Sequence, residues 1–176
     1  LMVLGTHVMD LMRFVAGNAQ WCFAQVTADG HSVARGDVCE GAEGIGPLAG
    51  DEIHAMYGFD GMTTGYFSTH RARHGASTRY GLQIYGSRGI LTVTTGAVPE
   101  IWHVDDPSWQ PGRSQAQWKR ISSDGVGKPE PLSDPNHAYG NRLIALDLIR
   151  AIETDTQPKG SMYDGRAALE MILAIY

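Results

Sequence analysis

Apolar residues recur with helical spacing at both ends of the chain. From Thr6 to Ala16 the spacing i, i+3, i+4, i+7 predicts a helix, which Thr6 can cap and Gly17 ends. Two more helices are expected near the other end, one after Asp134-Pro135 and one after Ser161 and Asp164, which have capping-box spacing. The apolar positions of these three helices are Val8, Leu11, Met12 and Val15; Ala145, Leu148, Ile149 and Ile152; and Ala168, Leu169, Ile172, Ile175 and Tyr176.

The middle of the chain has the alternating pattern of β-strands. The run from Ala19 to Ala28 places Trp21 and Phe23 on one face and smaller residues on the other, whereas residues 30–50 show no sustained period and their shape stays open. Consecutive hairpins follow, which predict an antiparallel meander. The expected strands are Glu52–Phe59 and Gly65–Arg71 around an Asp60-Gly61 turn, Thr78–Tyr85 and Ile90–Thr95 around residues 86–89, and outer strands at Ile101–Val104 and Trp118–Ile121.

An antiparallel sheet of this kind buries one face and needs helices to cover it. The fold class expected is therefore α+β, an open and mainly antiparallel sheet with helices packed on one face. The other face stays open, and several aromatic residues fall on the central strands, so we expect a homodimer or homotetramer formed through the open sheet. These residues are Tyr57, Phe59, Tyr66, Phe67, Tyr80 and Tyr85.

Composition narrows the function classes. The 176 residues are 43% hydrophobic, which suits a globular domain, and the formal charge is −5 without any long basic run, which argues against a nucleic-acid partner. No apolar stretch is long enough to span a bilayer, so we expect no membrane association. Cys22 and Cys39 stand 17 positions apart without a CxxC motif, so neither a disulfide framework nor a metal site is predicted.

Three motifs in order resemble one known family. They are Gly5-Thr6-His7-Val8-Met9-Asp10, Ile84-Tyr85-Gly86-Ser87-Arg88-Gly89-Ile90-Leu91, and the ending from Ala151-Ile152 through Pro158 to Asp164-Gly165-Arg166-Ala167-Ala168-Leu169-Glu170. Together they resemble the C-terminal domain of the Gfo/Idh/MocA oxidoreductases over nearly the whole chain. The resemblance implies that residues 1–176 form one C-terminal α/β substrate-binding and oligomerisation domain, a piece of a longer chain.

The family pairs this domain with a Rossmann domain that binds NAD or NADP. The sequence predicts that the Rossmann domain lies outside these residues, because the Gly cluster at residues 41–46 has the wrong spacing for GxGxxG and follows no strand. No cofactor-binding residue is therefore expected in this chain.

A hydroxyl can lose hydride only if its proton also leaves, so the family's reaction needs a general base. Imidazole suits this role because its pKa of about 6.5 lies near working pH, and the resemblance assigns the role to His7. Many family members carry an Asp four residues before this His, where the chain has Val3. Asp10, one helical turn after His7, is a candidate substrate-binding residue that could contact the ring, or a residue that favours the helix N-terminus.

The other polar candidates lie in two places. His70 and Arg71 belong to a cluster with Arg73, His74 and Arg79 that could hold a substrate carboxylate or sugar hydroxyls, or form a solvated turn. His137, with Asn136 and Tyr139 beside it, could face the pocket or act in helix capping. The predicted site is thus His7 as catalytic residue, with Asp10, His70, Arg71 and His137 as substrate contacts.

The function expected from the resemblance is the substrate-side domain of an NAD(P)-dependent oxidoreductase that acts on a sugar or cyclitol hydroxyl. One alternative is an NAD-assisted glycoside hydrolase on the same scaffold. Another is a non-catalytic relative used for sugar binding or assembly, which the Val3 departure favours. The expected compartment is the cytoplasm, with periplasmic export as the alternative.

Overall fold

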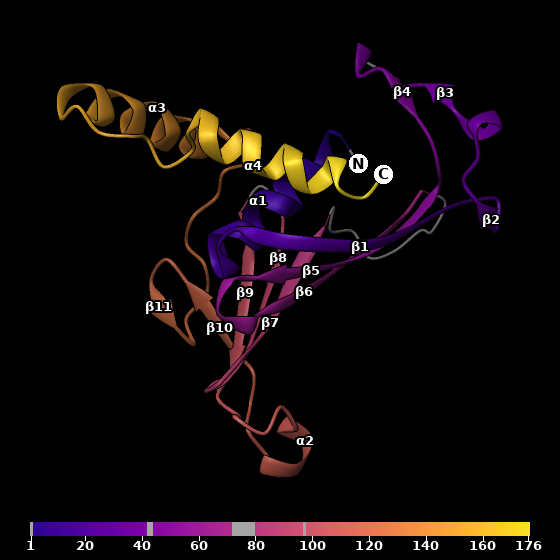
Figure 1. The fold of residues 1–176 in the computed structure, drawn as a ribbon. Helices are drawn as coiled ribbons and strands as arrows, with labels where there is room; N and C mark the ends of the chain where they lie inside the picture. The colour runs from indigo at the N-terminus through magenta and orange to yellow at the C-terminus, as the bar shows by residue number, and fades with distance from the viewer. Residues whose placement is uncertain (1, 42–43, 72–79, 97) are drawn as a thin grey trace. The chain divides into compact units, whose positions relative to one another are not determined.

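A computed structural model describes residues 2–41, 44–71, 80–96 and 98–176. The chain forms two compact units, each described here by itself (Figure 1). Unit 1 consists of residues 1–74 and 160–176, and unit 2 consists of residues 75–159. Unit 2 is thus an insertion between the two sequence segments that build unit 1.

Unit 1 is built on a four-stranded antiparallel sheet with the order β2-β1-β5-β6. Strands β1 (Ala19–Ala28) and β5 (Glu52–Phe59) match the predicted ranges, and β6 (Thr64–His70) begins and ends one residue earlier than expected. The stretch left open in the sequence holds short pieces only. These are β2 (His31–Ser32), the 3-10 turn Arg35–Asp37, and a ribbon of β3 (Cys39–Glu40) and β4 (Pro47–Leu48).

The strand alternation gives this sheet an inner and an outer face. On β5 the inner side chains Ile53, Ala55, Tyr57 and Phe59 are buried, and Phe67 of β6 lies opposite Ala55 on the same face. The outer face carries side chains of the opposite parity. In one row across the sheet, Phe23, Met56 and Tyr66 lie side by side.

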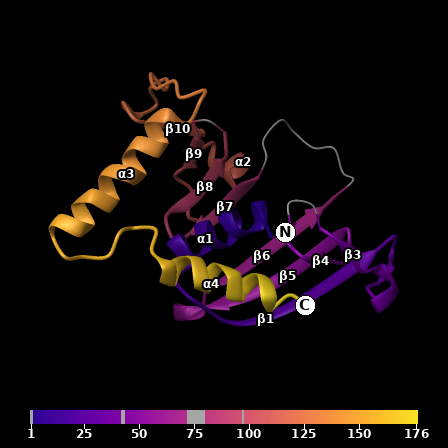
Figure 2. The same ribbon diagram turned by 90° about the horizontal axis from the view of Figure 1, so that it is seen from above.

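Helices α1 (Leu4–Ala16) and α4 (Met162–Leu173) pack together over the inner face (Figure 2). A Cβ on Gly65 would meet the Met12 side chain, and the Tyr57 hydroxyl donates a hydrogen bond to the Met171 carbonyl at 2.7 Å. The predicted capping box is confirmed, since the Ser161 hydroxyl accepts from the Asp164 N–H and the Asp164 carboxylate accepts from the Ser161 N–H.

The predicted cap of α1 is wrong. The helix begins at Leu4, before Thr6, and the Thr6 hydroxyl donates backward to the Val3 carbonyl at 2.6 Å instead of accepting from a backbone N–H. Gly17 ends the helix as expected, with φ of +83° and its N–H bonded to the Arg13 carbonyl. A hydroxyl inside the first turn lies close to a carbonyl of the preceding turn, which explains the reversed bond.

The two Asp-Gly pairs of unit 1 form different turns. Asp29-Gly30 makes the two-residue hairpin turn, with both φ values positive and Ala28 paired with His31. The pair expected to do so, Asp60-Gly61, instead lies in a 3-10 turn over Asp60–Met62 that is closed by a Phe59 N–H to Thr63 carbonyl bond. Ladder pairing of β5 with β6 stops at Gly58 and Thr64, which leaves a longer connection than a tight turn.

Unit 2 holds a five-stranded antiparallel sheet with the order β11-β10-β9-β8-β7. Strands β7 (Gly81–Gly86) and β8 (Gly89–Thr94) form the predicted hairpin, with Gly86 paired with Gly89. Residue 78, where the first strand of this hairpin was expected to begin, lies outside the described residues. The remaining elements are β9 (Glu100–Val104), the short helix α2 (Pro111–Ser114), β10 (Lys119–Ser122) and β11 (Gly125–Val126).

The long helix α3 (Ala138–Glu153) also belongs to unit 2. The predicted capping residue Asp134 does bind backbone N–H groups, those of Tyr139 and Gly140 at 2.9 and 3.0 Å, but from four positions before the helix begins. Pro135 therefore lies outside the helix. The expected apolar stripe is largely exposed, with Ile152 at 73% exposure, and Ala151 is the residue of this helix that is buried.

The α+β class with antiparallel sheets and few helices is confirmed, and in unit 1 both helices lie on one face of the sheet. The meander differs from the prediction in one respect, because the described strands form separate four- and five-stranded sheets and a small ribbon. Among the described residues, no helix combines the length and apolar character needed to cross a membrane.

Candidate functional site

His7 lies on the second turn of α1 with its side chain exposed. Asp10, one turn later, is 62% exposed and forms an ion pair with Arg13, whose Nη1 lies 3.6 Å from the carboxylate Oδ1. The carboxylate thus pairs with the guanidinium that follows it in the helix rather than with the ring of His7. The structure therefore places the two predicted residues on one helix, with Asp10 bound to Arg13.

Val3 precedes the first helical residue and is exposed. Its carbonyl accepts the Thr6 hydroxyl, so its backbone is part of the helix start. An aliphatic side chain here offers neither charge nor a hydrogen bond to His7.

The ladder between β5 and β6 separates His70 from Arg71. His70 lies opposite Glu52 and has the parity of the outer face, away from α1. Arg71 continues the ladder through its N–H bond to the Asp51 carbonyl and has the parity of the inner, helix-covered face. Consistent with this, Arg71 acts on Tyr176, next to α4, whose pKa is raised by burial and partly lowered by this guanidinium. The two residues lie on opposite faces of the sheet and do not line one pocket.

Glu52 lies close to two histidines on the outer face of the sheet. Its Oε1 lies 3.1 Å from His54 Nε2 and its Oε2 lies 4.0 Å from His70 Nε2. The alternation of β5 could have paired Glu52 with His54, two residues apart, but His70 joins them only through a register that the sequence does not reveal. Among the described residues no group of three or more His, Cys, Asp or Glu side chains could hold a metal ion.

His137 belongs to unit 2, just before α3, with a left-handed backbone at φ of +56°. Its side chain is exposed and makes no capping hydrogen bond, while its carbonyl accepts the Asn141 N–H at 2.9 Å. The predicted candidates Arg73, His74 and Arg79 lie outside the described residues.

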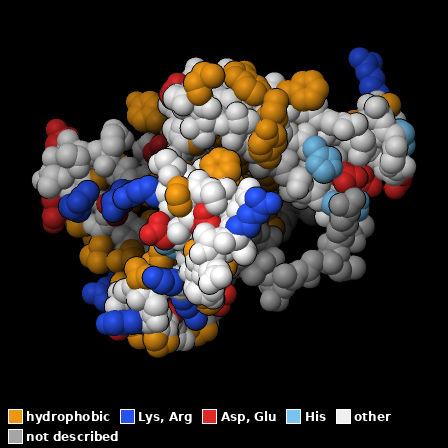
Figure 3. All heavy atoms as spheres, turned by 90° about the horizontal axis from the view of Figure 1, so that it is seen from below, with side chains coloured by type: hydrophobic (Ala, Val, Ile, Leu, Met, Phe, Trp, Pro, Cys, Tyr) orange, Lys and Arg blue, Asp and Glu red, His pale blue; other side chains and the backbone are white. Residues whose placement is uncertain are grey.

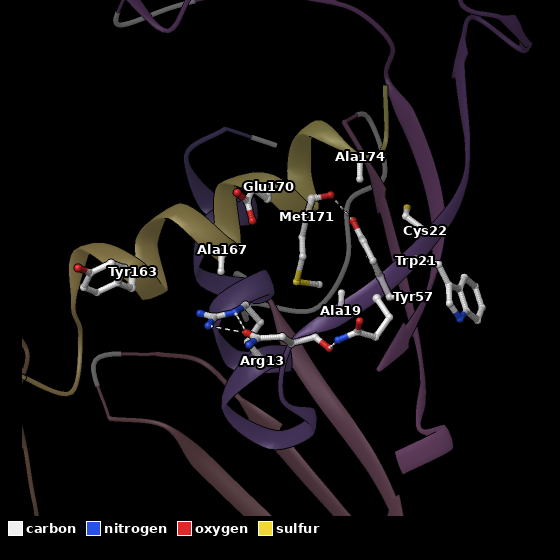
Figure 4. Close-up of a pocket in the computed structure, with 12 residues that line it drawn as sticks. Arg13, Ala19, Trp21, Cys22, Tyr57, Tyr163, Ala167, Glu170, Met171 and Ala174 are labelled. Carbon is white, nitrogen blue, oxygen red and sulfur yellow. Dashed lines mark hydrogen bonds between the residues drawn. The ribbon is translucent and has the colours of Figure 1, made fainter. Parts of the chain in front are cut away.

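A cavity of about 470 Å³ lies in unit 1 between the start of β1 and one side of α4 (Figure 4). It exists because small side chains face each other there, Ala19 and Cys22 from β1 and Ala167 and Ala174 from α4. None of the residues predicted for the site lines it. No sequence pattern predicts this cavity, because a hollow depends on how two distant segments pack.

The most buried charged group of this cavity, Arg13, is already bound by neighbouring side chains. The Arg13 side chain, 11% exposed, donates to Asn18 Oδ1 and to both the carbonyl and the carboxylate of Asp164, in addition to its ion pair with Asp10. Burial raises the pKa of the Tyr57 hydroxyl, and Cys22 beside it raises that pKa further. Burial also raises the pKa of the Cys22 thiol. Arg13 therefore fastens α1 to α4, and neither Tyr57 nor Cys22 is activated for proton transfer or nucleophilic attack.

The described residues offer no cradle for a dinucleotide. Such a cradle needs a glycine-rich turn between a strand and the N-terminus of a helix. The glycines at positions 41, 44 and 46 instead lie in the connection between the short strands β3 and β4, and the described part of this connection contains no α-helix. The expectation that this chain carries no cofactor-binding residue remains a prediction.

Several solved structures share the fold. A levoglucosan dehydrogenase in complex with NADH and levoglucosan superposes with a TM-score of 0.69 at 18% identity, over 98% of this chain and 47% of that chain. An NAD binding oxidoreductase from Klebsiella pneumoniae gives 0.66 at 15% identity, over 97% and 46%. The WlbA dehydrogenase from Bordetella pertussis, in complex with NADH and UDP-GlcNAcA, gives 0.57 at 17% identity, over 98% and 43%. The chain thus spans about half the length of each of these proteins.

No curated protein sequence matches the chain significantly. The model of one protein family does match, and it covers residues 1–176 in full. Its description is that of the oxidoreductase family, C-terminal alpha/beta domain. The resemblance seen in the three sequence motifs is thereby confirmed: the chain belongs to the Gfo/Idh/MocA oxidoreductase family, as its C-terminal α/β domain.

Proposed function

We propose that residues 1–176 are the substrate-side domain of an NAD(P)-dependent oxidoreductase that acts on a sugar or cyclitol hydroxyl, and that His7 is its general base. The observation that carries the proposal is the exposed imidazole of His7 on the second turn of α1, within the Gly5-Thr6-His7 motif of a chain that belongs to this family. The solved relatives bound to NADH with levoglucosan or a nucleotide sugar support the substrate class.

The reaction removes a hydride and a proton from one carbinol group and leaves a carbonyl. A nicotinamide dinucleotide, when bound, supplies the hydride acceptor. This chain supplies the proton acceptor, one ring nitrogen of His7, which takes the hydroxyl proton as the C–H bond breaks. Because the described residues hold no dinucleotide cradle, we propose that a Rossmann domain outside residues 1–176 holds the cofactor.

The four predicted substrate contacts do not have equal support. Arg71 has the parity of the face that α1 covers, and its guanidinium can bind hydroxyl or carboxylate oxygens. Asp10 lies on the same helix as His7, although its carboxylate is paired with Arg13. His70 has the opposite parity and pairs with Glu52, and His137 belongs to the other unit. Arg71 is therefore the contact that we rank first.

The experiment is His7→Asn in the intact enzyme. Asparagine keeps a polar side chain of similar size but cannot accept the proton, so kcat should fall by about 10²–10⁴. The acidic limb of the pH–rate profile should also flatten. The matched control is His31→Asn, which removes an exposed imidazole that lies 3.2 Å from Asp37 in the loop after β1. Turnover of His7→Asn near that of the unmodified enzyme, on a substrate that this enzyme oxidises, would refute the general-base role.

We further propose that the protein self-associates through the outer face of the unit 1 sheet. Trp21, Phe23 and Tyr66 are 49%, 71% and 76% exposed on this face. Figure 3 shows hydrophobic side chains in orange on the surface of the molecule, with histidines in pale blue beside acidic side chains in red. Of the six aromatic residues expected to mediate self-association, Tyr57, Phe59 and Phe67 are instead buried under the helices, because they have the opposite strand parity.

A further inference from the structure

Strand β1 lies at an open edge of the unit 1 sheet. On one side it pairs with β5 along its length, from Ala19 to Thr27. On its other side β2 pairs with Thr27 and Ala28 alone. Among the described residues, no other strand pairs with this second side, so the stretch before Val26 is an edge.

Two backbone hydrogen bonds show which backbone groups point to this edge. The Val26 carbonyl accepts from the Val33 N–H, on the β2 side, while the Thr27 carbonyl accepts from the Asp51 N–H, on the β5 side. The N–H and C=O of one residue in a strand point the same way, and the direction alternates along the strand. The N–H and C=O groups of Cys22 and Ala24 therefore point to the open edge, before the bulge between Ala19 and Trp21 interrupts the register.

This edge lacks the usual protection against pairing. Natural edge strands carry charges, prolines or inward-pointing lysines that prevent another strand from joining. From Asn18 to Ala28 the sequence NAQWCFAQVTA contains no charged residue, no proline and no glycine. Half-exposed Trp21 and largely exposed Phe23 add apolar surface beside the unpaired backbone.

We propose that a second copy of this chain pairs edge to edge with β1, antiparallel about a two-fold axis that passes through residues 22–24. The pairing would join two four-stranded sheets into one continuous sheet. This interface is distinct from the outer face proposed above, which needs no backbone pairing.

A second copy fits this edge for two reasons. A two-fold axis brings a strand against itself, so any charge would meet its own like charge, and this strand carries none. On the inner face the side chains nearest the axis, Cys22 and Ala24, are small, and Cys22 lines the hollow beside α4. Neither of these two side chains blocks the ladder.

The geometry makes Cys22 a reporter of this interface. With the two-fold axis at Phe23, the centre of residues 22–24, Cys22 lies opposite Ala24 of the other copy and diagonal to its own copy, within about 8 Å. In a face-to-face association the two Cys22 side chains would point away from the interface, because Cys22 has the inner parity. The two modes of association thus differ in which cysteines can be cross-linked.

The first experiment is cross-linking with a short bis-maleimide in the intact protein, with Cys39 and any cysteine outside residues 1–176 replaced by serine. Cys22 should give a covalent dimer. A matched variant moves the thiol to β6, two strands away from the edge, with Cys22→Ser and Thr69→Cys. Thr69 is exposed and has the inner parity, so neither the edge pairing nor the face-to-face association should cross-link it. Absence of the Cys22 dimer at a concentration where light scattering shows association would overturn the proposal.

The second experiment breaks the pairing with Ala24→Pro. Proline removes an N–H that points to the open edge and takes no part in the pairing with β5, so the sheet of one copy keeps its hydrogen bonds. The dissociation constant for self-association of Ala24→Pro, measured by analytical ultracentrifugation, should be at least about tenfold higher than that of the control Ala24→Gly, which keeps the N–H. Equal constants for the two variants would also overturn the proposal. Neither measurement uses substrate or cofactor. Failure of the edge-pairing proposal is therefore distinguishable from failure of the oxidoreductase assignment.

Discussion

The two faces of the unit 1 sheet have similar aromatic content and opposite surroundings. The inner face places Tyr57, Phe59 and Phe67 beneath α1 and α4, and each is buried. The outer face carries Trp21 and Phe23 on β1 and Tyr66 on β6, and these side chains are 49%, 71% and 76% exposed. Strand parity, not hydrophobicity, decides which aromatics form the core and which stay exposed.

This difference separates stability from assembly. Apolar burial under the helices stabilises unit 1 by itself, at about 25 cal/mol per Å² of surface removed from water. The outer aromatics contribute comparable energy only when another surface covers them. Substitutions on the two faces should therefore change different measurements.

The largest effect on stability is expected from a substitution in the core beneath the helices. Ile172→Ala truncates a fully buried side chain of α4 and leaves a cavity, so the free energy of unfolding should fall by about 2–5 kcal/mol. Urea unfolding followed by circular dichroism measures this. The control is Phe23→Ala on the outer face, which should cost far less stability in the dissociated protein. Equal losses for both variants would contradict the distinction between the faces.

Gly58 tests how the outer face is built. A Cβ at this position would lie 2.0 Å from the Trp21 ring, so the indole occupies the space that a side chain at this glycine would fill. Gly58→Val should force the indole away and cost about 1–3 kcal/mol of stability. In a Trp21→Ala background the same substitution should cost much less. A double-mutant cycle without coupling would show that the ring does not depend on Gly58.

Substitutions on the outer face should change self-association more than stability. Tyr66→Glu places a carboxylate in the row with Met56 and Phe23, and its burial in an interface is unfavourable. The dissociation constant for self-association should rise by about tenfold or more, while the unfolding curve of the dissociated protein changes little. Met162→Glu, at the exposed start of α4 over the inner face, is a control for added charge. Light scattering that shows no change with Tyr66→Glu would remove the outer face from the assembly.

The smallest effect concerns pH. The Ser161 hydroxyl and N–H, together with Arg13, hold the pKa of Asp164 below its ordinary value. A carboxyl whose pKa is lower in the folded state stabilises the fold at neutral pH, and this contribution is lost as pH falls below about 3.9, the unfolded value. Asp164→Asn should therefore lower the free energy of unfolding at pH 7 relative to the unmodified protein. At pH 3 the difference between the two proteins should be smaller. Urea unfolding of both proteins at the two pH values measures this convergence, and equal differences at pH 7 and pH 3 would contradict it.

Much of the fold follows from local pattern. Strands β1 and β5, helix α4 and its capping box agree with the sequence because alternation, helical spacing and side-chain capping are local properties. The turns were less predictable. Asp29-Gly30 and Asp60-Gly61 carry the same signal, but only the first lies between strands whose register brings Ala28 opposite His31.

The candidate site shows where local pattern ends. The helical position of His7 was predictable, whereas the partner of Asp10 was not, because Arg13 competes for the same carboxylate from the next turn. The separation of His70 from Arg71 requires the β5–β6 register, and the grouping of Glu52, His54 and His70 requires it too. The exposed stripe of α3 also differs from expectation, because helical spacing describes an amphipathic face without saying what covers it.

The Arg13 side chain has a consequence for the order in which the chain folds. It binds Asp164, 151 positions later, so α1 and α4 meet only after the whole of unit 2 has been made. At about 5–20 residues per second, synthesis of the intervening chain takes many seconds. During this time Met9 and Met12 have no α4 to pack against, while unit 2, whose sequence is continuous, can complete its own hairpins. Unit 2 is therefore expected to fold during synthesis before unit 1, although unit 1 contains the first residues of the chain.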